Sequence, residues 1–522
     1  MTDGQNWWED AVVYQVYPRS FADSNGDGVG DLAGVRSKLP YLADLGVDAI
    51  WLTPFYPSPL ADGGYDVSDY CDVDPLLGTL ADFDGLVKDA SANGIRVVVD
   101  IVPNHCSAQH PLFQAALAAG PGSAERDWFI FRAGRTAPGG TPDSGTPDGE
   151  LPPNNWLSAF GGPAWTRVPD GQWFLHLFDS TQPDFNWHNP EVPAFFADVL
   201  RFWLDRGVAG FRVDVANGLF KDPVLPDIAE TATEYAPSAF RHRAELHELY
   251  PTWRAILDSY PAGEFPGSRT AIGEVWYDAP QTLAPYLLPG GLPQVFNFQL
   301  LQAPWEATAL RAAVDDAIAL AGGSRAPWVL GNHDVTRPVT RFGGAQAGRA
   351  AALLQLALPG SVYIYQGEEL GLPEITDLPD AARQDPTFLR TGGTVPGRDG
   401  CRVPLPWSAA SPAEPSWLPQ PADWGSYSVE TESADPDSYL SLYRAALRLR
   451  REHPALGPGA LRWLESPADS LVFARDPGFI FAANLGTEAL ALPPRTAVLL
   501  ASGPLSSDGA ALPPDTAVWL SA

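Results

Sequence analysis

Apolar segments alternate with amphipathic segments along most of the chain, and this alternation predicts parallel βα units. Runs rich in β-branched and aromatic residues predict strands at 12–17, 47–53, 95–102, 207–216, 270–276, 295–300, 328–334 and 362–365. Apolar residues at helical spacing predict helices at 32–45, 81–92, 192–205, 243–260 and 346–358. This number of strands favours an α/β fold with a closed (β/α)8 TIM barrel over an open doubly wound sheet. No G-x-G-x-x-G motif follows an early strand, which weakens the second alternative further.

The alternation stops in two stretches of the chain. Residues 106–182 are rich in Pro, Gly and Trp, so we expect a loop subdomain inserted after the third strand. A second polar, Pro-rich stretch follows the last predicted barrel strand, and beyond a predicted helix at 439–452 the tail consists of short strands. The expected domains are a barrel at 1–105 and 183–457, the insertion at 106–182 and a small C-terminal all-β domain at 458–522.

Composition narrows the classes of partner. The 522 residues are 45% hydrophobic, enough for a large core, and the net charge of −30 argues against nucleic acid and anionic membranes. The three cysteines, Cys71, Cys106 and Cys401, are an odd number without a close pair. We therefore expect reduced thiols, and a cytoplasmic location for the protein. The acidic start lacks the apolar core of a signal peptide, and no apolar run is long enough to span a membrane. We expect a monomer or a small homo-oligomer.

The loop from Asp23 to Asp31 has the pattern of a cation-binding loop. Oxygen-bearing side chains recur at nearly every second position, with glycines between them, at Asp23, Asn25, Asp27 and Asp31. This spacing resembles the first part of an EF-hand calcium loop, although the distal bidentate Glu is missing. The alternative is an Asp/Gly-rich turn in which Asp31 caps the next helix. We favour the metal interpretation.

Charged residues cluster where the predicted strands end. Arg212 and Asp214 are two residues apart in an otherwise apolar strand, so both side chains face the same side. A structural ion pair would explain these two alone, but further polar residues end other strands: Asp100, His105, Glu274, His333 and Asp334. In a (β/α)8 barrel these ends meet at one face, where neighbouring carboxylates raise one another's pKa values. One ionised and one protonated carboxyl group is the requirement of glycoside hydrolysis.

Four segments carry a specific resemblance to a known family. Residues 100–105, 210–214, 273–276 and 332–334 resemble, in order and spacing, the four signature regions of glycoside hydrolase family 13, the α-amylase family. Further segments resemble its α-glucosidase and oligo-1,6-glucosidase branch, at 13–21, 64–70, 182–187 and 398–407. The resemblance covers nearly the whole chain.

The resemblance implies a role for each matching residue. Asp214 would attack the anomeric carbon and form a β-linked glucosyl-enzyme, and Glu274 would be the acid/base. Asp334 would hold the 2- and 3-hydroxyls of the sugar, and Arg212 would keep Asp214 ionised. The remaining implied substrate contacts are a stacking ring at Tyr65, hydrogen-bonding imidazoles at His105 and His333, and a pocket wall at Phe160. For both histidines and for Phe160, simple core packing is the alternative.

Two further features are implied in the same way. Asp62 and Arg402 match a pair that closes the non-reducing end of the site in this branch, so the enzyme would be exo-acting. The loop 23–31 matches a calcium site of the branch, with Val29 contributing its carbonyl oxygen. No organic cofactor is expected.

The expected function is a retaining α-glucosidase that acts on small α-linked glucosides. The linkage stays open between α-1,4 and α-1,6, because Val215 resembles the α-1,6-cleaving type whereas residues 216–219 and 275–276 do not. One alternative is a glucosyl-transferring or isomerising relative, such as a trehalose or isomaltulose synthase. Another is a non-catalytic barrel protein, which would lack part of the carboxylate set and carry a membrane anchor.

Overall fold

The computed structural model describes residues 6–136, 150–229, 231–232, 236–260, 267–321, 326–410 and 415–521. Its centre is a parallel sheet of β1 (Val12–Val16), β2 (Ala49–Leu52), β3 (Arg96–Ile101), β9 (Gly210–Val213), β10 (Thr270–Gly273), β11 (Gln294–Val295), β12 (Trp328–Val329) and β13 (Val362–Tyr365). The strands pair in the order β11-β10-β9-β3-β2-β1-β13-β12, so the last strand in sequence lies beside the first. This order confirms the predicted (β/α)8 barrel.

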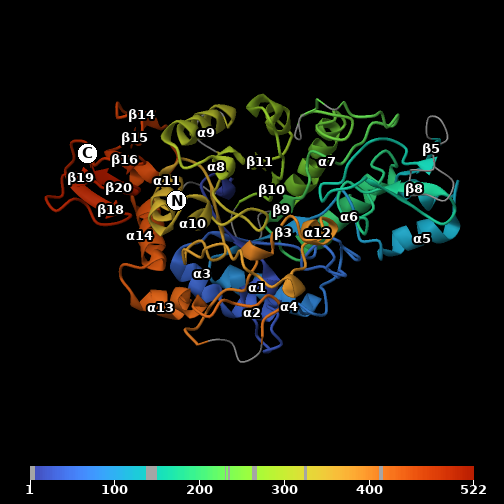
Figure 1. Cartoon of the computed structure of the whole chain (residues 1–522), viewed down its shortest axis with the longest axis horizontal. Helices are drawn as coiled ribbons and strands as arrows, with labels where there is room; N and C mark the ends of the chain where they lie inside the picture. Colours follow the sequence, from blue (N-terminus) through green and yellow to red (C-terminus); the bar gives the residue numbers. More distant parts are fainter. Residues whose placement is uncertain are drawn as a thin grey trace.

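Helices connect the strands and surround the sheet (Figure 1). They are α1 (Pro18–Phe21), α2 (Leu32–Ser37), α3 (Leu39–Leu45), α4 (Leu80–Ala92), α6 (Glu191–Asp205), α7 (Leu246–Ser259), α8 (Gln299–Gln302), α9 (Ala307–Leu320), α10 (Pro338–Arg341), α11 (Ala345–Ala357), α12 (Pro386–Arg390), α13 (Val429–Ala434) and α14 (Tyr439–Glu452). The helix predicted at 32–45 is two helices, because Pro40 in the first turn of α3 cannot donate to the preceding turn. The strand predicted at 295–300 is also partly wrong, since residues 299–302 form α8.

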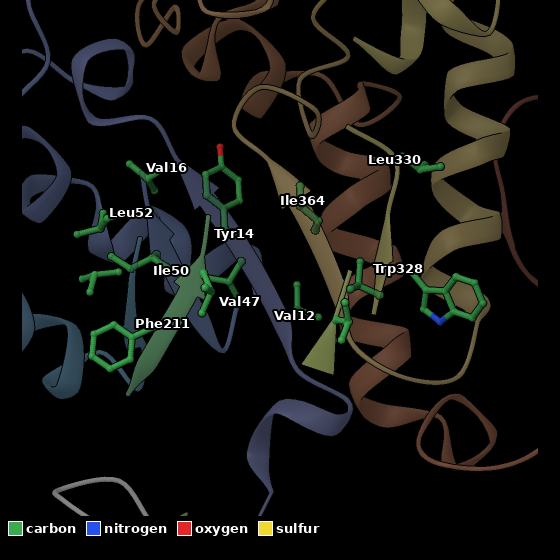
Figure 2. Packing of buried hydrophobic residues seen from close by; sticks show 14 of the residues in the cluster. Val12, Tyr14, Val16, Val47, Ile50, Leu52, Phe211, Trp328, Leu330 and Ile364 are labelled. Atoms are coloured by element: carbon green, nitrogen blue, oxygen red, sulfur yellow. The ribbon is translucent and has the colours of Figure 1, made fainter. Parts of the chain in front are cut away.

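The barrel strands are buried on both faces. Along β1, Val12, Tyr14 and Val16 pack outward against the helices. Figure 2 shows these three side chains together with Ile50, Leu52 and Ile364 from neighbouring strands. Val13 points to the opposite face and belongs to the inner cluster. The inner cluster also contains Trp51 and Phe296, whose ring centroids are 5.6 Å apart. Such two-sided burial is what the nearly continuous apolar runs predicted.

Two smaller units flank the barrel at opposite ends of the view in Figure 1. The insertion after β3 contains α5 (Pro111–Ala119), the antiparallel strands β4 (Phe131–Ala133), β8 (Gln172–Leu175) and β7 (Trp165–Arg167), and the pair β5 (Arg135–Thr136) and β6 (Glu150–Leu151). The C-terminal sheet has the order β14-β15-β16-β20-β18, with bounds Arg462–Trp463, Ser470–Arg475, Phe479–Asn484, Thr516–Ser521 and Ala497–Ala501; β17 (Leu490–Ala491) pairs with β19 (Ala511–Leu512). The exact domain boundaries stay predictions.

The state of the cysteines and the character of the helices bear on two expectations from the sequence. Cys71, Cys106 and Cys401 are all free thiols. Within the described ranges, the helices lack the combination of length and apolar character needed to cross a bilayer.

Candidate active site

A cavity of about 200 Å³ opens among the loops that follow the carboxyl ends of the barrel strands. Eight of the predicted site residues line it: Asp62, Tyr65, His105, Phe160, Asp214, Glu274, His333 and Asp334. The other lining residues were not among the predicted site residues: Ala159, Phe178, Val215, Asn217, Arg241, Trp276 and Arg398. Of these, Val215, Asn217 and Trp276 belong to the segments compared for linkage preference. The volume is below the roughly 300–1,000 Å³ of drug-sized ligand sites, so it suits one small ring.

The Arg212 guanidinium brings three carboxyl groups together. Its Nη1 lies 2.9 Å from Asp100 Oδ1 and 2.6 Å from Asp214 Oδ1, and its Nη2 lies 2.7 Å from Glu274 Oε2. Strand register explains this meeting: Asp100 on β3 is directly opposite Arg212 on β9, while the acids at 214 and 274 follow β9 and β10 by one residue. Both acids therefore face one cavity, as the predicted chemistry requires.

Two of the three acids around Arg212, Asp214 and Asp100, have raised pKa values. Burial raises the pKa of Asp214 well above its usual range; Arg212 opposes this shift, and the carboxylates of Glu274 and Asp100 reinforce it. Burial likewise raises the pKa of Asp100 to about 6. Arg212 thus acts in the expected direction on Asp214, but burial outweighs it. Asp100 and Asp214 together can therefore hold a proton near neutral pH.

Glu274 is held by donors on both of its oxygens. Besides Arg212, the Val215 amide donates to Oε2 at 3.2 Å, and the Trp276 indole N–H donates to Oε1 at 2.9 Å. Val215 has a φ of 46°, in the left-handed region that a β-branched residue rarely adopts. Trp276 is in turn stacked on Phe298, with ring centroids 4.3 Å apart. Backbone strain and aromatic packing together orient the carboxyl group.

Asp334 lies in a strongly cationic setting. Its Oδ1 is 3.0 Å from Arg398 Nη1 and 3.1 Å from Arg402 Nη2, and its Oδ2 is 3.2 Å from His333 Nε2. Burial alone would raise the pKa of Asp334, but His333 and the two guanidinium groups lower it far below its usual value. Burial also lowers the pKa of His333, so the arginines are the cations that keep Asp334 ionised at neutral pH.

The predicted partner of Asp62 is wrong. Asp62 Oδ1 pairs with Arg398 Nη2 at 2.6 Å, whereas Arg402 donates from Nε to the His333 carbonyl at 2.9 Å and pairs with Asp334. Both arginines belong to the quoted segment 398–407, and sequence spacing did not reveal which side chain reaches across the cavity. Arg402 is bound to His333 and Asp334 in the loop after β12, so it is Arg398 that contacts Asp62 in the loop after β2.

Three other predicted substrate contacts have clear surroundings. The Tyr65 hydroxyl donates to Asp100 Oδ2 at 2.9 Å, and its ring is stacked on His333 with centroids 5.1 Å apart. His105 Nε2 lies 3.1 Å from Gln182 Nε2, and burial lowers the His105 pKa to about 4, so this imidazole is neutral at pH 7. Phe160 lies beneath the Arg398 guanidinium, 5.0 Å from ring centroid to Cζ. Their contacts to a sugar stay predictions.

The loop 23–31 is curled by its own side chains. Asp23 accepts from the amides of Asn25 and Gly28 at 3.0 and 2.8 Å, and Asp27 accepts from the Val29 amide at 2.9 Å. Asp31 accepts from Gly34 N at 2.6 Å and caps α2, as the non-metal alternative predicted. In the part of the chain that the structure describes, no three His, Cys, Asp or Glu residues gather as metal ligands. Calcium binding stays a prediction.

Of the residues that the sequence did not single out, Arg398 and Trp276 had the clearest signals. Arg398 opens a recognised segment, and Trp276 follows Glu274 by two residues. Phe178, Asn217 and Arg241 lie in irregular segments, where residue type alone carries no signal for a cavity wall.

Comparison with known proteins gives consistent results. Residues 15–459 match the family described as "Alpha amylase, catalytic domain". A probable alpha-glucosidase of Rhizobium meliloti (strain 1021) is 40% identical, covering 91% of this chain and 88% of that protein. An oligo-1,6-glucosidase of Parageobacillus thermoglucosidasius is 34% identical, covering 93% and 89%.

Two solved structures extend the comparison to a glucosyl transfer enzyme and a trehalulose synthase. The alpha-glucosyl transfer enzyme XgtA superposes with a TM-score of 0.86 at 38% identity, covering 98% of this chain and 99% of that chain. The trehalulose synthase MutB from Pseudomonas mesoacidophila MX-45 superposes with a TM-score of 0.88 at 31% identity, covering 99% and 100%.

Proposed function

Because the chain belongs to the α-amylase family of glycoside hydrolases, we propose that it is a retaining, exo-acting α-glucosidase of short α-linked glucosides. The observation that carries this proposal is the Arg212 guanidinium, which holds the carboxyl groups of Asp214 and Glu274 at 2.6 and 2.7 Å beside one small cavity. Two carboxyl groups in this close arrangement suit a covalent, two-step displacement rather than a direct attack by water.

The proposed reaction assigns a separate task to each acid. Asp214 attacks the anomeric carbon as the glycosidic bond breaks, and Glu274 gives its proton to the leaving oxygen. In the second step Glu274 takes a proton from water, which attacks the glucosyl-enzyme and releases glucose with retained configuration. Asp334, kept ionised by Arg398 and Arg402, accepts hydrogen bonds from the sugar hydroxyls and favours the positively charged transition state.

Exo-action follows from the closed end of the cavity. The ion pair between Asp62 and Arg398 links two opposite loops, and Phe160 lies against Arg398. A further sugar attached to the non-reducing end would collide with these groups. The free hydroxyls of a terminal glucose can instead exchange hydrogen bonds with the Asp62 carboxylate and the Arg398 guanidinium.

The decisive experiment is a substrate panel followed over time by NMR. The enzyme is incubated with maltose, isomaltose, sucrose and maltotriose, and the first anomer of the released glucose is recorded. Release of α-glucose from chain ends supports the proposal and also decides the linkage preference. β-Glucose as the first product, or cleavage within longer chains, would contradict it.

The second candidate is a glucosyl-transferring or isomerising enzyme, because XgtA, named an alpha-glucosyl transfer enzyme, and MutB, named a trehalulose synthase, match nearly the whole chain. The same Asp214 and Glu274 would serve both reactions, and only the acceptor of the glucosyl group would differ. Incubation with concentrated sucrose or maltose separates the two: new disaccharides in excess of free glucose would favour transfer.

We also propose that the loop 23–31 binds Ca²⁺ as a structural ion. Its donors are the hard oxygen atoms that Ca²⁺ prefers, from Asp23, Asn25, Asp27 and the Val29 carbonyl. The second Asp31 oxygen accepts from Ser24, so Asp31 contributes only if that contact opens. A rise in melting temperature with added Ca²⁺, abolished by Asp23→Ala, would support the site; no response would contradict it.

A cytoplasmic location and a monomeric or small homo-oligomeric state complete the proposal. The three free thiols support a reducing compartment. Fractionation of the source cells and light scattering of the purified protein test these two points.

A further inference from the structure

Helix α12 makes polar contacts at both of its ends to the two walls of the cavity. At its start, Asp385 Oδ1 accepts from Thr387 N at 2.8 Å, while Asp385 Oδ2 accepts from Arg398 Nε at 2.5 Å. At its end, Arg390 Nη1 lies 3.2 Å from Asp179 Oδ2, and Nη2 donates to the Gly161 carbonyl at 2.7 Å. One short helix therefore ties the loop of Arg398 to the inserted subdomain.

Within the insertion, hydrogen bonds connect Asp179 back to Asp62 at the cavity. The Asp179 amide donates to Gln182 Oε1 at 2.8 Å, and Gln182 Nε2 donates to Asp62 Oδ2 at 3.0 Å. Asp62 then pairs with Arg398, which closes the circuit. We call this closed set the polar ring; its members are Asp62, Gln182, Asp179, Arg390, Asp385 and Arg398.

Three of the six members of the polar ring are almost completely buried. Gln182, Asp385 and Asp62 are 0, 1 and 3% exposed, whereas the Arg390 side chain is 22% exposed. In such a dry network each hydrogen bond fixes the orientation of the next group. Burial opposes ionisation of Asp179, but hydrogen bonds from Thr181 and the Arg390 guanidinium hold the Asp179 pKa below its usual value. The Arg390–Asp179 pair is therefore charged at neutral pH.

The same arginine also fixes the aromatic wall. Gly161, whose carbonyl Arg390 binds, directly follows Phe160, and Phe160 lies against the Arg398 guanidinium. Arg390 thus reaches the closed end of the cavity by two routes, through Asp179 and Gln182 to Asp62, and through Gly161 to Phe160. It does not itself line the cavity.

We propose that Arg390 and Asp179 are positioning residues that determine specificity. The contact between Arg390 and Asp179, which we call the clasp, holds Asp62, Arg398 and Phe160 in place. In this arrangement the three residues bind a terminal glucose and exclude a longer non-reducing end. This inference rests on the proposed exo-α-glucosidase function and assigns part of its specificity to a contact outside the cavity.

Three variants test the clasp: Arg390→Ala, Asp179→Asn and Arg390→Lys. The first two should raise KM for nitrophenyl α-glucoside about tenfold, the effect of losing a charged hydrogen bond, with kcat changed by less than about threefold. Arg390→Lys should recover part of the loss, because a lysine keeps the charge but cannot donate as a fork to both Asp179 and Gly161. In Arg390→Ala and Asp179→Asn, a nitrophenyl maltoside blocked at its non-reducing end should be cleaved faster relative to the unblocked maltoside than in the wild type.

The matched control is Arg135→Ala. Arg135 also ties the insertion to the barrel side, with Nη1 2.8 Å from Asp227 Oδ2, but it lies outside the polar ring and the cavity lining. An unchanged KM in both Arg390→Ala and Asp179→Asn, or an equal rise in Arg135→Ala, would overturn the clasp. A wild-type enzyme that releases no glucose from any α-glucoside would instead refute the proposed function. Asp179→Asn preserves side-chain size, so it tests the clasp even if Arg390→Ala fails to fold.

Discussion

Asp62 Oδ1 and Arg398 Nη2 lie 2.6 Å apart and join the loop after β2 to the loop after β13. Because Arg398 also contacts Asp334, this guanidinium connects the acid at the closed end with the acid expected to hold the sugar hydroxyls. Replacing Arg398 should therefore affect binding more than replacing any other arginine of the site.

We expect Arg398→Met to raise KM for maltose or isomaltose at least about tenfold, from the loss of charged hydrogen bonds worth about 1.5–3 kcal/mol. Arg402→Met should act through Asp334 and the His333 carbonyl, and lower kcat more than it raises KM. Steady-state kinetics of the two variants separate these effects. The opposite division between Arg398 and Arg402 would restore the pairing predicted from sequence.

The nucleophile and the acid/base should fail in different ways. Asp214→Asn keeps an oxygen for Arg212 but cannot form the glucosyl-enzyme, so kcat should fall by at least about 10³-fold with an unchanged melting temperature. Glu274→Gln should keep more activity on nitrophenyl α-glucoside than on maltose, because nitrophenolate leaves without a proton. Comparable losses on both substrates would remove Glu274 from the acid role.

Substrate binding should depend on the ionisation of Asp62. Burial raises the pKa of this carboxyl to about 6, although Arg398 and Arg402 oppose the shift. Below that pH the group gains a proton and loses its charge attraction to Arg398, so KM should rise as the pH falls from 7 to 5. Asp62→Asn should have a high KM that no longer changes over this range. A wild-type KM that is flat with pH would contradict the assignment.

Trp276 should influence the rate through its indole N–H. The N–H donates to Glu274 Oε1 at 2.9 Å and helps to orient this carboxyl group. Trp276→Phe preserves stacking on Phe298 but removes the donor, so kcat should fall about tenfold, the effect of losing one charged hydrogen bond, with an unchanged melting temperature. An unchanged kcat would indicate that the indole acts only by packing.

Lys221 should be important for stability rather than for chemistry. Its buried ammonium lies 2.8 Å from Asp184 Oδ2 and 2.6 Å from Asn104 Oδ1. Lys221→Met leaves a buried carboxylate without its cation, which should lower the free energy of unfolding by about 3–5 kcal/mol. Arg254→Ala, which removes a partly exposed pair with Asp258, should cost less than about 1 kcal/mol in the same denaturation experiment. Equal losses would contradict this account.

Much of the site could be predicted from the sequence because its groups follow strands. Asp214 and Glu274 come one residue after β9 and β10, so identifying the strands was enough to place both at one face. Helical spacing predicts one helix at 32–45, but α2 and α3 are separate, because Pro40 in the first turn of α3 has no amide hydrogen to donate to the preceding turn.

The sequence by itself determined that strands and helices alternate to form a barrel, and which acids stand at the ends of β9 and β10, because these features depend on local periodicity. Only the tertiary structure decided that Arg398 rather than Arg402 meets Asp62, and that Arg390 reaches Asp179 from a segment 211 positions away. Long, flexible guanidinium side chains choose among several carboxylates by distance and burial in the folded chain, and sequence spacing contains neither quantity.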